Sequence, residues 1–233
     1  MTSRTTIKLI FLQLLFLIST KSFSQNSDKL YNHETAVIEL DSLSQRIKSG
    51  LPYKINSTLI QYIYNQQDKF PEIPENLSSR VKMGIIAPIF TQTSLIMKSQ
   101  LNPPQDSISK EEAMLAATTG YQSIKIISLS NEFLNTLDED SYNYKTRLRG
   151  FNQGVKGLQE FLLGYTTMTF LENQNQTVDD ILISSLLDFA PKIINEFPID
   201  KKESTIDLLK SSIEGEEDIR LINEFNNFIK SLK

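Results

Sequence analysis

The sequence predicts an all-α fold: a single multi-helix bundle of about seven or eight helices that follows a cleaved signal peptide. Apolar residues recur mainly at spacings of three and four, whereas the strict alternation that indicates strands is scarce. The chain has 233 residues and no cysteine. In an exported chain no disulfide can then hold the fold, so its stability has to come from buried apolar surface.

The start of the chain has the layout of a secretory signal peptide. Arg4 and Lys8 precede an apolar run over 9–18, and Ser22 and Ser24 then fill the small-residue positions that a signal peptidase prefers. A permanent membrane anchor would need roughly 20 mostly apolar residues, which this stretch does not supply. We therefore predict a signal peptide over 1–24, cleavage between Ser24 and Gln25, a helical domain over 25–233 and no membrane span in the mature chain.

The charge of the mature domain argues against two classes of partner. The full chain has a formal net charge of −4, and cleavage would remove three basic residues and no acidic one, which gives −7. An acidic surface repels nucleic acid and anionic lipid, so we expect neither as a partner. Abundant Asn, Ile and Lys without Trp is typical of bacteria with AT-rich genomes, and we expect a periplasmic or secreted protein.

Three helices are expected in the first hundred residues. The first covers 28–49 and ends at Gly50, because glycine is favoured just beyond a helix end. The second covers 57–69 and the third covers 74–100, and two prolines break the chain between them.

The apolar stretch 84–90 in the third helix contains a proline. Pro88 frees the carbonyl group of residue 84 and pushes its ring towards that group, but the residue at 84 is glycine, which relieves the clash. We expect a kinked, buried helix here. The alternative is an unwound element that lines a cavity.

An Asn-Pro-Pro sequence near 102–108 is the clearest break in the chain. We expect a short linker between packed helices, and the alternative is a subdomain break. Ser109 and Glu112 then form a capping box, which predicts a helix over 110–137 with a bend at Gly120.

The most distinctive pattern lies in the expected helix 141–173. Four glycines follow one another at helical spacings of four, three and seven, beside a row of large apolar residues. A glycine inside a helix costs about 1 kcal/mol relative to alanine, so something has to compensate for the four. We expect either a close approach of another helix of the chain or a groove for a partner helix or a flat or extended ligand. The glycines are Gly150, Gly154, Gly157 and Gly164.

The start of the same helix holds a candidate ligand-binding group. Lys145 and Arg149 share a helix face, and Tyr142 and Tyr144 provide aromatic surface nearby. Such side chains can hold an anionic or sugar ligand. The alternative is a solvated basic face that the acidic residues 138–140 neutralise.

Three further helices are expected at 177–196, 201–213 and 216–233. Acidic residues at the start of the first and third, and lysines at the end of the last, match the helix dipole. The last helix has an apolar seam made of Ile222, Phe225, Ile229 and Leu232.

Signatures of catalysis and of metal binding are missing from the sequence. His33 is the only histidine, and position 37, where a zinc-protease motif would have a second histidine, is valine. With no cysteine either, we expect no metal site and no cofactor. No serine has the glycine neighbours of a nucleophile elbow. The sequence therefore favours a role other than catalysis and indicates no catalytic residue.

These features favour binding as the function. We expect a non-catalytic helical interaction protein of the bacterial cell envelope, whose partner is another envelope protein. One alternative is a hydrolase of envelope polysaccharide that uses two carboxylates from distant segments. Another is a periplasmic carrier of a small ligand with its pocket at 84–90.

Overall fold

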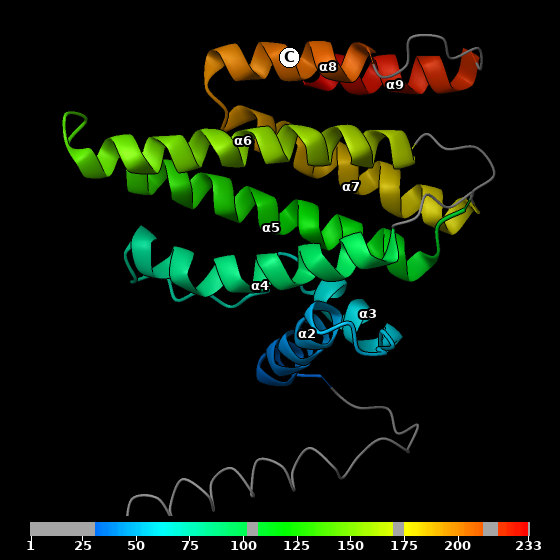
Figure 1. Ribbon diagram of the computed structural model, residues 1–233. Helices are drawn as coiled ribbons and strands as arrows, with labels where there is room; N and C mark the ends of the chain where they lie inside the picture. Colours follow the sequence, from blue (N-terminus) through cyan, green and yellow to red (C-terminus); the bar gives the residue numbers. More distant parts are fainter. Residues whose placement is uncertain (1–30, 102–106, 170–174, 212–218, 233) are drawn as a thin grey trace, which may run out of the picture. The chain divides into compact units, whose positions relative to one another are not determined.

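The structure, a computed structural model, describes residues 31–101, 107–169, 175–211 and 219–232, which belong to one compact unit (Figure 1). The described residues contain eight α-helices and no strand, so the predicted all-α fold is confirmed. The predicted signal peptide over 1–24 lies outside the described residues. The helices are α2 (His33–Lys48), α3 (Ser57–Asn65), α4 (Ser79–Gln100), α5 (Lys110–Leu134), α6 (Tyr142–Thr169), α7 (Gln176–Asn195), α8 (Ile199–Ser211) and α9 (Ile219–Ser231).

Side chains that the sequence places at helix ends fix several of these bounds. The Ser109 hydroxyl accepts from the Glu112 N–H at 3.2 Å, and the Glu112 carboxylate accepts from the Ser109 N–H at 2.7 Å. This is the predicted capping box of α5. Asn32 and Asn175 cap α2 and α7 in the same way, by accepting from N–H groups of the first turn. Gly50, just beyond α2, has a φ of 65°, which favours glycine.

α5 lies at the centre of the unit. It packs against α3, α4, α6 and α7, whereas α2 packs against α3 and α4, and α9 packs against α7 and α8. Figure 1 shows α4, α5 and α6 in succession, with α8 on the side of α6 away from α4. A linker or a subdomain break was expected near 102–108. Residues 102–106 of this stretch lie outside the described residues. The two helices that flank it, α4 and α5, pack along each other.

The core between α5, α6 and α7 centres on the buried ring of Phe189. The ring centroid of Phe189 lies 4.8 Å from that of Tyr165 and 5.9 Å from those of Tyr121 and Phe161. The two tyrosine contacts are edge-on, a favourable geometry for aromatic pairs. A Cβ atom on Gly120 would lie 2.5 Å from two atoms of the Phe189 ring. Gly120 therefore makes room for this ring against α5.

α4 runs without interruption through Pro88. Gly84 and Pro88 are exposed, while Ile86 and Ile89 are buried. The stretch 84–90 was expected to be buried, but only one side of it is. α2 and α5 pack against α4, and no other described helix does. The alternative of an unwound element is wrong.

Within the described part of the chain, no helix is both long enough and apolar enough to cross a membrane.

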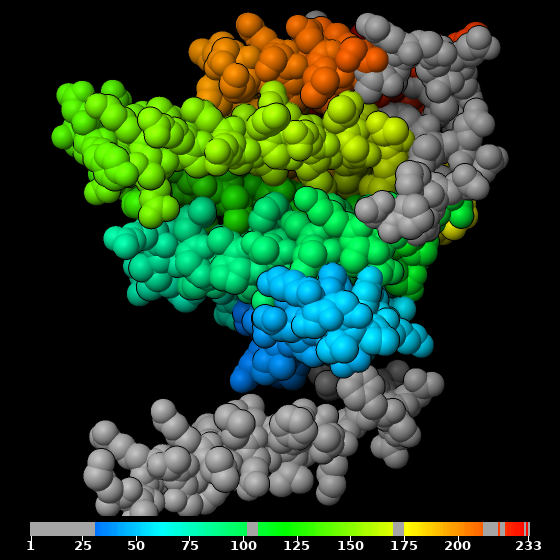
Figure 2. All heavy atoms as spheres, in the orientation of Figure 1, coloured from blue at the N-terminus to red at the C-terminus, as the bar shows by residue number. Residues whose placement is uncertain are grey.

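A hollow runs between α4 and α6. Both helices lie on α5, and within the described residues they do not contact each other. Figure 2 shows α5 set back between them, so that its side chains form the floor of the hollow. One flank of α6 is therefore open, in addition to its outer side.

Candidate functional site

α6 has a buried face and an exposed face. The buried side chains recur at helical spacings and pack towards α5 and α7, which explains why this segment forms a helix. Polar, basic and glycine residues occupy the rest of its surface. The largest buried side chains of α6 are Phe151, Leu158, Leu162, Tyr165 and Met168.

The four glycines of α6 are exposed. A Cβ atom built on Gly150, Gly154, Gly157 or Gly164 would meet no atom of the described residues within 4 Å. A close approach of another helix of this chain, expected as one explanation of these glycines, is thus not found in the described part of the chain. The groove for a partner helix or a flat or extended ligand stays a prediction.

Gln159 shows on which side of α6 the glycines lie. Its Nε2 donates to the Oγ1 of Thr205 at 2.8 Å, so this side of α6 faces α8. At 3.6 residues per turn, the glycines lie about half a turn around the helix from Gln159. The glycine row therefore borders the hollow between α6 and α4 (Figure 2).

The candidate ligand group at the start of α6 is only partly assembled. Tyr142 is 83% exposed, and Lys145 and Arg149 are exposed on the same side of the helix. Tyr144 is half-buried and packs against the core instead. Three of the four predicted residues therefore share a surface, and the fourth has a structural role.

The acidic residues 138–140 do not pair with these basic side chains. In the described part of the chain, no ion pair links any of them to α6. Asp138 instead accepts from the Asp140 N–H at 3.1 Å through its side chain and from the Ser141 hydroxyl at 2.6 Å through its carbonyl group. Asp138 therefore shapes the turn before α6. The alternative of a basic face neutralised by these acids is not supported by any ion pair among the described residues.

Two further basic residues of α6 were not predicted as part of the candidate ligand group, and one of them shares its surface. Lys156 is exposed on the same side as Lys145 and Arg149, and the three form what we call the basic face of α6. Lys156 follows Arg149 by seven residues, about two helical turns, and this spacing could have indicated from the sequence that the two share a face. Arg147 points to the other side, with its guanidinium carbon 5.7 Å from the ring centroid of Phe133.

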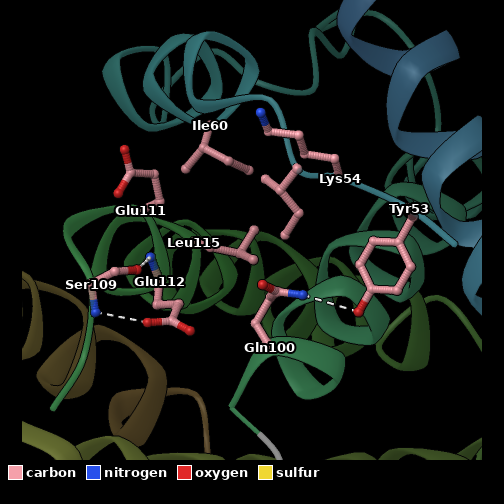
Figure 3. A pocket seen from close by; sticks show the side chains of 9 residues that line it. Tyr53, Lys54, Ile60, Gln100, Ser109, Glu111, Glu112 and Leu115 are labelled. Carbon is pink, nitrogen blue, oxygen red and sulfur yellow. Dashed lines mark hydrogen bonds between the residues drawn. The ribbon is translucent and has the colours of Figure 1, made fainter.

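A cleft of about 420 Å³ lies at the start of α5, and Figure 3 shows its side chains. Its walls come from four parts of the chain: the connection between α2 and α3, α3 itself, the end of α4 and the start of α5. Its residues are far apart along the chain, so no local sequence pattern indicated it. We call it the Tyr53 cleft, and it is lined by Tyr53, Lys54, Ile55, Ile60, Gln100, Ser109, Glu111, Glu112 and Leu115.

A second cleft, of about 510 Å³, contains His33 and Lys125. The Lys125 ammonium donates to the carbonyl groups of Asp68 and Phe70 at 2.9 and 3.2 Å, and burial lowers the pKa of this lysine. The His33 ring lies 5.3 Å from that of Phe70, and its Nδ1 accepts from the Glu72 N–H at 3.4 Å. Both side chains thus hold the segment after α3 in place.

Neither cleft matches the alternatives that the sequence left open. The stretch 84–90, expected to line a carrier pocket, contributes to neither of them. Their carboxylates are exposed or half-buried, whereas the hydrolase alternative would be supported by two buried ones in one cleft. Within the described residues, no group of three or more His, Asp or Glu is placed to hold a metal ion.

Two core tyrosines have strongly perturbed acidities. Burial raises the pKa of Tyr165 well above its ordinary value, and burial, with a smaller contribution from the Asp188 carboxylate, raises the pKa of Tyr121 to about 12. Ser185 opposes the shift of Tyr165 without completing a hydrogen bond of normal geometry to its hydroxyl. Both hydroxyls therefore keep their protons to a higher pH than an exposed tyrosine does.

Comparisons with known proteins assign no family to the chain. No family model matches it, and no curated protein or solved structure matches it.

Proposed function

We propose that the chain is an exported, non-catalytic binding protein of the bacterial cell envelope, and that another envelope protein docks on the open side of α6. One observation carries the proposal: the four glycines of α6 face open space. Each costs about 1 kcal/mol relative to alanine, and no contact with the described residues compensates for them. A partner whose backbone approaches α6 closely would supply that contact.

The charge of α6 favours an acidic partner surface. Lys145, Arg149 and Lys156 are exposed, and within the described residues none of them takes part in an ion pair. They stand out in a chain whose formal net charge is −4. Basic side chains on an acidic protein attract a partner of opposite charge and orient it during association.

A pull-down of residues 25–233 from envelope extract tests the proposal. The wild-type chain is compared with Gly154→Leu, which fills the glycine row, and with Gln45→Leu, which adds the same side chain at an exposed position of α2, a helix that does not pack against α6. We expect a stoichiometric protein partner that is retained by the wild type and by Gln45→Leu and lost by Gly154→Leu. The partner is identified by mass spectrometry, purified and titrated against each chain.

Two outcomes would count against the proposal. Equal binding by Gly154→Leu and the wild type would show that the glycine row is not the docking site. Retention of glycan or lipid without a protein partner would favour the carrier or the hydrolase instead. Circular dichroism of each variant, compared with the wild type, separates lost binding from lost folding.

A further inference from the structure

We propose that the Tyr53 cleft binds a small zwitterion that carries an ammonium group, a carboxylate and a short apolar part. This is the chemistry of a free apolar amino acid or of a short apolar peptide with free termini. The inference concerns a different surface from α6 and does not depend on the proposed protein partner.

Two unpaired opposite charges line the cleft. Lys54 comes from the connection between α2 and α3 and is exposed, and Glu111 comes from the first turn of α5 and is half-buried. Within the described residues, the Lys54 and Glu111 side chains form no ion pair, with each other or with any other residue. Neither side chain forms a hydrogen bond there. Figure 3 shows the two side chains on either side of Ile60. A ligand with both charges could meet Glu111 through its ammonium group and Lys54 through its carboxylate.

The other polar side chains of the cleft already have partners. The Gln100 side-chain amide donates to the Tyr53 hydroxyl at 3.0 Å, and Glu112 is engaged with Ser109 in the capping box of α5. These bonds fix both sides of the cleft, as the dashed lines in Figure 3 show. The site is therefore formed before a ligand arrives, which reduces the entropic cost of binding.

The apolar part of the ligand has a surface to contact. Tyr53 and Ile55 are half-buried, so each presents part of its side chain to the cleft. Ile60 and Leu115 also line the cleft and are fully buried. The volume of about 420 Å³ is at the small end of ligand pockets, which suits an amino acid or a short peptide better than a polymer.

Titrations of the ¹⁵N-labelled chain, residues 25–233, followed by NMR test the inference. The probes are leucine, leucyl-leucine, N-acetyl-leucyl-leucine, which lacks the ammonium group, and leucyl-leucine amide, which lacks the carboxylate. We expect saturable shifts of the Tyr53, Ile55 and Leu115 amides with leucine or leucyl-leucine. The stronger of these two identifies the source of the ligand, and each blocked peptide should bind more weakly by about fivefold.

Two variants assign the charges. Glu111→Gln should remove the preference for a free ammonium group, and Lys54→Met should remove the preference for a free carboxylate. Glu132→Gln and Lys98→Met change the same charges at exposed positions of α5 and α4 outside the cleft and should bind as the wild type does. No saturable shift up to about 10 mM, shifts that map elsewhere, or preferences that persist in both cleft variants would each overturn the inference.

Discussion

At Gly120 a missing side chain makes room for the ring of Phe189, whereas at Gly154 a missing side chain leaves the backbone open. Phe189 cannot easily move aside, because its ring is fully buried and contacts the rings of Tyr121 and Tyr165. The same residue type thus has opposite roles at two positions of the chain.

Gly120→Ala should therefore destabilise the protein. The added methyl group would overlap the Phe189 ring, and overpacking of this kind costs about 1–3 kcal/mol. Urea denaturation of residues 25–233 measures the free energy of unfolding. A variant as stable as the wild type would mean that α5 and α7 do not approach each other as closely here as the structure has them.

The acidity of Tyr121 gives a second expectation for a single residue. Its pKa rises from 10.0 to about 12 in the folded chain, so the native state holds this proton more tightly than the unfolded state does. The associated stability is fully present below pH 10 and is lost as the pH rises from about 10 to about 12. Tyr121→Phe should make the free energy of unfolding fall less steeply between pH 10 and pH 12. An unchanged slope would contradict the assignment.

Sequence reasoning found the glycines of α6 but not the role of Gly120. The row at Gly150, Gly154 and Gly157 is a local pattern, visible in one stretch of the chain. The need for glycine at 120 depends on Phe189, which lies far along the sequence and meets α5 only when the chain folds. A contact of this kind leaves no local signal.

α6 is an element whose stability and binding make opposing demands. Its buried face holds it against α5 and α7, and its glycines weaken the same helix without a compensating contact in the described part of the chain. Natural proteins accept such losses where function requires an open backbone.

Gly154→Ala should consequently stabilise the isolated protein by about 0.5–1 kcal/mol. Alanine favours the helix over glycine by this amount, and the new methyl group meets nothing within 4 Å. Denaturation in urea is again the measurement. A loss of stability would indicate that an atom outside the described residues packs against this position.

Helices were predictable because the information that specifies them is local. Periodic apolar residues, the Ser109–Glu112 capping box and Gly50 all act within a few positions. The burial of 84–90 was overestimated, since apolar content alone does not tell how many neighbours a helix has. The Tyr53 cleft could not be predicted, because Lys54 and Glu111 belong to separate elements that only the packing of α3 on α5 brings together.

At the scale of the whole unit, the contacts of the helices are uneven. α5 packs against four other helices, whereas α8 packs against α6, α7 and α9 and buries only Thr205 and Leu209. Regions with few buried apolar contacts open at lower free energy than the core. The described part of the chain therefore has a stable centre at α5 and a weaker edge at α8.

Hydrogen exchange should resolve this difference. Amides of α8 should exchange through local opening, well before those of α5. Gln159→Leu removes the bond from α6 to the buried Thr205 hydroxyl, at a cost of about 1 kcal/mol, and should speed exchange in α8 while leaving α5 unchanged. Equal exchange free energies in α5 and α8 would mean that the unit opens only as a whole.

The central position of α5 also has a consequence in time. α3 buries Leu59, Ile60 and Ile63, and it rests on α5, which ends at Leu134. Ribosomes add about 5–20 residues per second. The apolar side of α3 is therefore synthesised several seconds before α5, the helix that covers it, is complete. During this interval the nascent chain has no complete core, and a chaperone can still engage it before it folds.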